Sequence, residues 1–100
     1  MSDAVEKGRG RNSDASVWDT SLRDLVDYLA RGLVDLPEQV EVEEIEEPDA
    51  LVFELKVAEE DLGKVIGKQG RTARSVRTIL GAVSMKLHRR YTLDILEEND

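Results

Sequence analysis

Apolar residues recur at helical spacing in two stretches of the chain, about 20–34 and 70–87. In each stretch they lie four, three and four positions apart, which places them on one stripe of an α-helix. The first stripe is formed by Leu22, Val26, Leu29 and Leu33, and the second by Val76, Leu80, Val83 and Leu87. The pattern predicts two amphipathic helices. The first should end before Pro37, because proline disrupts the interior of a helix.

Alternating apolar and polar residues predict three strands. The segment 40–47 begins with valines that alternate with glutamates, but Ile45 breaks the alternation, so a bulge or an early end is expected there. The segments 51–57 and 91–96 alternate throughout. Because the connection through Pro48-Asp49 is short, the first two strands should pair as an antiparallel hairpin.

Together with a short helix at 58–67, these segments give the order α-β-β-α-α-β. A strand that follows two helices should cross over in the right-handed sense and lie parallel to 51–57. The expected fold is α+β, a three-stranded mixed sheet covered on one face by three helices. Residues 1–18 lack periodicity and are expected to form a disordered arm, 19–97 one domain, and 98–100 a polar tail.

Aromatic residues are few, and three of them fall in periodic apolar positions. Tyr28, Phe53 and Tyr91 are therefore predicted to lie in the core, and Trp18 could pack against the start of the first helix. This number of aromatic side chains is too small for a base-stacking platform of the RRM or OB kind.

The chain has 100 residues and no cysteine, which fits one small domain in a reducing compartment. Its polar start has no apolar segment like that of a signal peptide, and no apolar run is long enough for a membrane span. We therefore expect a cytoplasmic protein that does not enter a membrane.

Charge is distributed unevenly along the chain. The net charge is −8, yet residues 62–93 contain eight cations and no acid, whereas 35–61 contain twelve acids and Lys56 as the sole cation. The eight cations are Lys64, Lys68, Arg71, Arg74, Arg77, Lys86, Arg89 and Arg90. Two solvated faces of different charge would explain scattered residues, but a block this long favours a directed binding face.

The basic block contains the sequence GKVIGKQGR, residues 63–71, whose glycines and lysines suggest a site for phosphate. A Walker A loop does not fit, because only three residues separate Gly63 from Gly67 and no Ser or Thr follows Lys68. A dinucleotide fingerprint does not fit either, because its first glycine pair is missing and a helix precedes the segment.

Two interpretations of the loop remain. Gly67 and Gly70 can simply end one helix and relieve a turn. Alternatively, Gly67-Lys68-Gln69-Gly70 can grip a nucleic acid backbone, because glycine permits close approach and the following helix presents its N-terminal amides. The second interpretation also accounts for the loop's polar interior and basic flanks. The candidate binding residues are Lys64, Val65, Ile66, Gly67, Lys68, Gln69, Gly70, Arg71 and Arg74, with Val65 and Ile66 as the floor of a groove for bases.

The motif VIGKQGR within this element order resembles a type II KH domain, over about residues 20–97. The stretches LVDYLARGLVDLPEQVEVEE and LKVAEEDLGKVIGKQGRTARSVRTIL are similar to the small bacterial single-KH family KhpA (YlqC-type). The resemblance implies a cytoplasmic protein that binds single-stranded RNA through its GxxG loop, as an RNA chaperone or regulator. It also implies a homodimer, pairing with a larger Jag/KhpB-type KH protein, and links to cell elongation and cell wall organisation.

Two other functions remain open. The chain could mainly pair with other KH proteins, with RNA binding incidental, using exposed positions such as Gly81 and Met85. An enzyme has little support, because His88 has no Asp, Cys or Ser partner at a catalytic spacing. The glutamates of the hairpin lie on an alternating strand with no loop to gather them, so we expect a solvated face, no metal and no cofactor.

Overall fold

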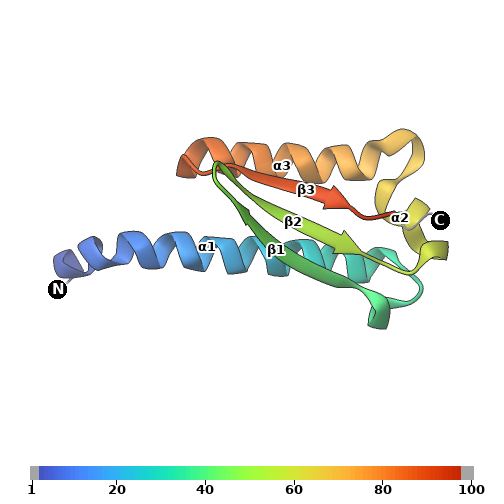
Figure 1. Ribbon diagram of the computed structural model, residues 1–100, viewed down its shortest axis with the longest axis horizontal. Coiled ribbons are helices and arrows are strands. Elements are labelled where there is room, and N and C mark those ends of the chain that lie inside the picture. The colour runs from blue at the N-terminus through green and yellow to red at the C-terminus, as the bar shows by residue number, and fades with distance from the viewer. Residues whose placement is uncertain (1–2, 98–100) are drawn as a thin grey trace.

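The computed structural model describes residues 3–97, with side chains placed from Val17 onward. Figure 1 shows a twisted sheet of strands accompanied by long helices. The helices are α1 (Asp3–Leu33), α2 (Leu62–Ile66) and α3 (Arg71–Leu87), and the strands are β1 (Glu41–Glu47), β2 (Ala50–Lys56) and β3 (Tyr91–Ile95). Short 3-10 turns occupy Pro37–Gln39, Glu59–Asp61 and Lys68–Gly70.

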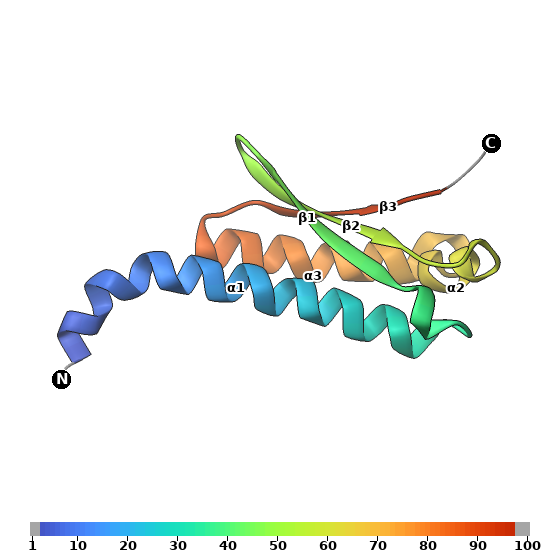
Figure 2. The ribbon, with the colours of Figure 1, turned by 60° about the horizontal axis from the view of Figure 1, so that its bottom comes forward.

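The three strands form one mixed sheet in the order β1-β2-β3. Strand β2 pairs antiparallel with β1 and parallel with β3, as expected from the short hairpin and the two-helix crossover. Helices α1 and α3 lie side by side on one face of the sheet (Figure 2). The predicted α+β fold, with three helices and a three-stranded mixed sheet, is therefore confirmed.

The bulge expected at Ile45 is absent. Pairing between β1 and β2 continues without interruption from Glu41–Lys56 to Glu47–Ala50. Ile45 stands opposite Val52 on the face of the sheet that the helices leave open, and both side chains are half-buried. Contact between these two apolar side chains stabilises Ile45 on the open face, so regular pairing is kept and no bulge forms.

The core lies between the sheet and the helical layer. Phe53 and Tyr91 are buried and stack with ring centroids 6.0 Å apart, as their periodic positions predicted. Tyr28 was expected beside them, but its side chain is 76% exposed. The reason is that Val26 and Ala30 face the core, and a residue halfway between them on a helix points to the opposite side.

Helix α1 begins at Asp3, well before the start expected near residue 20. The segment contains no proline, and extending an existing helix is far easier than nucleating one, despite the two glycines at positions 8 and 10. The N-terminal part of α1 projects past the sheet, at the end opposite α2 (Figure 1). The division of the chain into arm, domain and tail remains a prediction.

The open face of the sheet carries a row of carboxylates. Glu43 stands opposite Glu54, and Glu54 stands opposite Asp94, so one acid comes from each strand. Among the described residues, no three acidic or histidine side chains form a group that could hold a metal ion. The helices of the same described region include none long and apolar enough to cross a bilayer.

Candidate nucleic-acid interface

The turn between α2 and α3 depends on glycine at its first position. The Gly67 N–H closes α2 by donating to the Gly63 carbonyl at 2.9 Å, and Gly67 itself adopts φ 83° and ψ 166°. A Cβ atom at this position would overlap Thr72 Oγ1 and lie 2.7 Å from the Thr72 backbone nitrogen. Gly67 therefore ends α2 and also permits the close return of the chain.

The turn is left-handed at Gln69 and Gly70 and leads directly into α3. Gln69 has φ 56° and Gly70 has φ 74°, and the Gly70 N–H donates to the Gly67 carbonyl at 2.9 Å. No side chain caps the N-terminus of α3. Lys68 and Gln69 are exposed at the tip of this turn, which we call the GKQG loop (residues 67–70).

Two arginines of α3 support the GKQG loop. Arg71 Nη2 donates to Gln69 Oε1 at 3.0 Å, and Arg74 Nη2 reaches the Gln69 carbonyl oxygen at 3.4 Å. With Lys68 they gather three cations around the N-terminal end of α3, where the helix dipole adds further positive potential. This arrangement suits an anionic backbone.

A groove runs beside the GKQG loop, between α3 and the free edge of β3. Its apolar lining is Ile66, Ala73 and Ile95, and its remaining lining is Gly70, Arg74, Arg77 and Glu97. Ile66, Gly70 and Arg74 are among the binding residues predicted from the sequence, whereas Arg77 and Ile95 are not. The spacing of 70, 73, 74 and 77 along one helix face could have indicated Arg77, whereas Ile95 depends on how β3 lies against α3.

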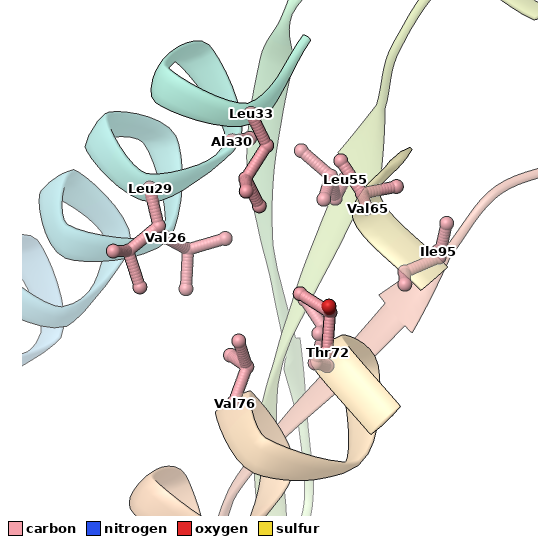
Figure 3. Close-up of a pocket in the computed structure, with 10 residues that line it drawn as sticks. Val26, Leu29, Ala30, Leu33, Leu55, Val65, Thr72, Val76 and Ile95 are labelled. Atoms are coloured by element: carbon pink, nitrogen blue, oxygen red, sulfur yellow. The ribbon is translucent and has the colours of Figure 1, made fainter. Parts of the chain in front are cut away.

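Two of the predicted binding residues lie away from this groove. Val65 is 4% exposed and points into an apolar crevice between α1, α3 and the sheet, together with Leu33 and Leu55 (Figure 3). Lys64 Nζ lies 3.4 Å from Asp35 and 3.7 Å from Asp61. Ile66 alone of the Val65–Ile66 pair thus lines the groove, and the amine of Lys64 is close to carboxylates of its own chain.

The carboxylate of Asp61 has a structural role. Its side chain is fully buried and accepts hydrogen bonds from the backbone N–H groups of Asp35 and Leu36, at 3.2 and 3.0 Å. Because these donors follow α1, the carboxylate joins the end of α1 to the start of α2. It therefore fixes the helix that leads into the GKQG loop.

A second polar cluster joins the elements at the opposite end of the domain. Asp19 of α1 accepts two hydrogen bonds from Arg89, each 3.1 Å, and one from the Tyr91 hydroxyl, 2.9 Å. Arg89 also donates to Glu46 at 3.2 Å. Burial, with the bond to Asp19, raises the pKa of Tyr91 to about 12, and the hydrogen bonds to Asp19 raise the pKa of Arg89 further. His88 is exposed beside this cluster, at the end of α3, as predicted.

Comparison with known proteins agrees with this geometry. Residues 23–95 match the family model described as KhpA/KhpB, KH domain. The chain is 50% identical over 78 residues to the RNA-binding protein KhpA of Aquifex aeolicus, covering 78% of this chain and 99% of that protein. It is 43% identical over 75 residues to the RNA-binding protein KhpA of Clostridium acetobutylicum, covering 75% of this chain and all of that protein.

No solved structure shows significant similarity to this chain. The family match nevertheless includes all three strands of the sheet, and with them α2, the GKQG loop, α3 and β3, which build the groove. The predicted resemblance to a KH domain of the KhpA type is thereby confirmed. The chain belongs to the KhpA/KhpB family of KH-domain proteins.

Proposed function

We propose that this chain is a non-catalytic protein that binds single-stranded RNA, gripping the RNA backbone with its GKQG loop. The relatives from Aquifex aeolicus and Clostridium acetobutylicum are both named RNA-binding proteins. The observation that carries the proposal is the GKQG loop itself, where two positive-φ glycines, exposed Lys68 and the flanking arginines meet at an uncapped helix N-terminus. Bases attached to the gripped backbone would then lie in the adjoining groove.

The test is fluorescence anisotropy of a labelled single-stranded RNA across a salt series. A KH loop contacts about four nucleotides, so the plot of log affinity against log salt should have a slope near −3, at roughly −0.7 per phosphate. The variant Lys68→Asp, Gln69→Asp places two carboxylates at the loop tip and should abolish binding. Circular dichroism establishes that the variant is folded.

The far end of α3 supplies a matched control, Lys86→Asp with His88→Asp. Each pair replaces one lysine and one uncharged residue with aspartate, so both change the net charge equally. In each pair the second residue has a positive φ, 56° at Gln69 and 55° at His88, and aspartate tolerates that conformation better than most residues. Equal weakening by both pairs would show that total charge, rather than the GKQG loop, governs binding.

A second candidate function is pairing with another KH protein, either a second copy or a larger KhpB-type partner. It is supported by apolar side chains that α1 and α3 leave exposed, since Tyr28, Ile79 and Met85 are 76%, 47% and 79% exposed. Gly81 lies on the same helix as Ile79 and is also exposed. A dimer would carry two GKQG loops and gain affinity for one RNA strand through effective concentration.

Light scattering tests this second function. We expect a dimer mass for the wild-type chain and a monomer mass for Ile79→Lys. A monomer at high protein concentration would contradict self-association and leave a heterologous KH partner to be tested by co-purification of the two purified proteins. RNA binding by the Ile79→Lys monomer, weaker than that of the dimer but with the same dependence on Lys68, would show that both functions coexist.

A further inference from the structure

We propose that Arg77 gives the groove a preference for bases with two neighbouring hydrogen-bond acceptors, guanine or cytosine, over adenine and uracil. This inference rests on the proposed RNA-binding function and assigns a role to a residue outside the GKQG loop. Arg77 lies seven residues beyond Gly70, which places it roughly 10 Å further along the α3 axis. It shares the groove with Ala73 and Ile95.

The guanidinium of Arg77 is held in place by the sheet. Its Nε donates to the backbone carbonyl of Leu93 at 3.2 Å. Strand β3 pairs only with β2, so this carbonyl lies on the free edge of the sheet, across the groove from α3. The bond immobilises a long side chain before any ligand arrives, and a ligand therefore loses less conformational entropy on binding.

The rest of the guanidinium is available to a ligand. Arginine carries five N–H donors in a planar fork, and the bond to Leu93 uses only the Nε donor. Within the described part of the chain, the two Nη groups of Arg77 have no hydrogen-bond or ion-pair partner. The apolar side chains of Ala73 and Ile95 line the same groove, and Arg77 itself is exposed, so a ligand can reach the two Nη groups.

A planar fork of this kind recognises two acceptors side by side. Phosphate offers such acceptors, but Lys68, Arg71 and Arg74 already surround the GKQG loop, where the backbone is expected to lie. At Arg77 the groove is lined by the apolar side chains of Ala73 and Ile95 and by the acidic Glu97, and both features favour an uncharged base over a phosphate. Guanine presents O6 and N7 on one edge, and cytosine presents O2 and N3. Adenine places an acceptor beside an amino donor, and uracil separates its two carbonyls by an N–H group.

The experiment measures base preference in the wild type and in Arg77→Lys, which keeps the charge but removes the fork. The probes are labelled oligouridines of about eight nucleotides, twice the length that one KH loop contacts, with alternate positions replaced by guanosine, cytidine or adenosine. The wild type should favour the guanosine or the cytidine probe by roughly five- to a hundredfold. Arg77→Lys should lose that preference, so that its affinities for the four probes become similar to one another.

Two controls separate base reading from a merely structural role. Arg90→Lys, an exposed arginine beyond α3, should leave both affinity and preference unchanged. A probe containing 7-deazaguanosine, which lacks the N7 acceptor, tests the contact without altering the protein. It should bind less well than the guanosine probe if guanine is the preferred base, whereas a cytosine preference identifies the other edge.

The outcomes distinguish this inference from the function on which it rests. If Lys68→Asp, Gln69→Asp abolishes binding while Arg77→Lys keeps the wild-type preference, the GKQG loop binds RNA and the role given to Arg77 is wrong. Equal affinity of the wild type for all four probes also overturns that role. If the GKQG loop variant binds RNA as well as the wild type, the proposed function and this inference fail together.

Discussion

Replacing Gly67 with alanine should destabilise the domain more than the same change at any other glycine of the GKQG turn or of α3. At φ 83° and ψ 166° an alanine occupies a region that glycine alone visits readily, at a cost of about 1–3 kcal/mol. The new Cβ would also overlap Thr72 Oγ1 and approach the Thr72 backbone nitrogen. A backbone atom cannot rotate away as a side chain can, so the start of α3 must shift. We expect the free energy of unfolding to fall by about 2–4 kcal/mol in total.

Alanine substitutions at Gly70 and Gly81 provide comparisons for the loss of stability expected at Gly67. Gly70 has φ 74° but no atom within 4 Å of an added Cβ, so alanine there carries a conformational cost of about 1–2 kcal/mol, partly offset through the unfolded chain. Gly81 lies inside α3 with the same open surroundings, and alanine there should stabilise by about 0.5–1 kcal/mol. The three substitutions are chemically identical and differ only in conformation and contacts.

Urea unfolding followed by circular dichroism measures all three variants, with stabilities compared at a common m-value. The loss at Gly67 should exceed that at Gly70 by at least about 1 kcal/mol, or roughly 4–8 °C in Tm for a domain of this size. Equal losses at Gly67 and Gly70 would refute the argument, because they would show that the close return of Thr72 imposes no constraint. Comparing the RNA affinities of the same three variants would show whether binding depends on the conformation of the GKQG loop.

Two further changes test the polar clusters at the two ends of the domain. Asp61→Ala leaves the partly buried backbone N–H groups of Asp35 and Leu36 without their acceptors. It should cost about 2–4 kcal/mol in urea unfolding, whereas Asp35→Ala, at an exposed side chain, should stay within about 0.5 kcal/mol of the wild type; similar losses would contradict the role given to Asp61. Tyr91 ionises near pH 10 in an unfolded chain and at about 12 here, so the unfolded state binds fewer protons between these values. The free energy of unfolding should therefore be intact below pH 10 and fall by about 2–3 kcal/mol as the pH rises to 12. Tyr91→Phe should remove this part of the decline, and an unchanged alkaline profile in that variant would contradict the assignment.

The sequence was sufficient for the fold because its local patterns agree with one another. The helical stripe that contains Leu80 and the alternation that contains Phe53 each show which residues face the core. The short connection at Pro48 allows the first two strands to pair only as an antiparallel hairpin. The predicted first helix starts too late, near residue 20 instead of Asp3. Apolar spacing was its only criterion, whereas a helix also extends through residues that carry no stop signal. The bulge or early end expected at Ile45 is wrong because this residue pairs with Val52 on the open face of the sheet. The core position expected for Tyr28 is wrong because it lies off the stripe that contains Val26.

The candidate site was less accessible to sequence analysis, because its details depend on distant contacts. Lys64 belongs to the basic block, but its nearest carboxylates include Asp35, which arrives from the end of α1. Arg77 looked like one more cation, and only the position of β3 shows that its side chain crosses the groove to Leu93. Charge and spacing along the chain locate a binding face, whereas the direction of each side chain on that face requires the packed structure.

The row formed by Glu43, Glu54 and Asp94 limits the direction from which a nucleic acid can approach. At physiological ionic strength, charges act on one another over about 8 Å. A phosphate that meets the open sheet within that range is repelled, while one that meets the GKQG end is attracted. Two copies of the protein that meet sheet to sheet repel each other for the same reason. If the proposed function is right, this strip of acids directs RNA toward the GKQG loop, and it also disfavours sheet-to-sheet stacking of crowded molecules.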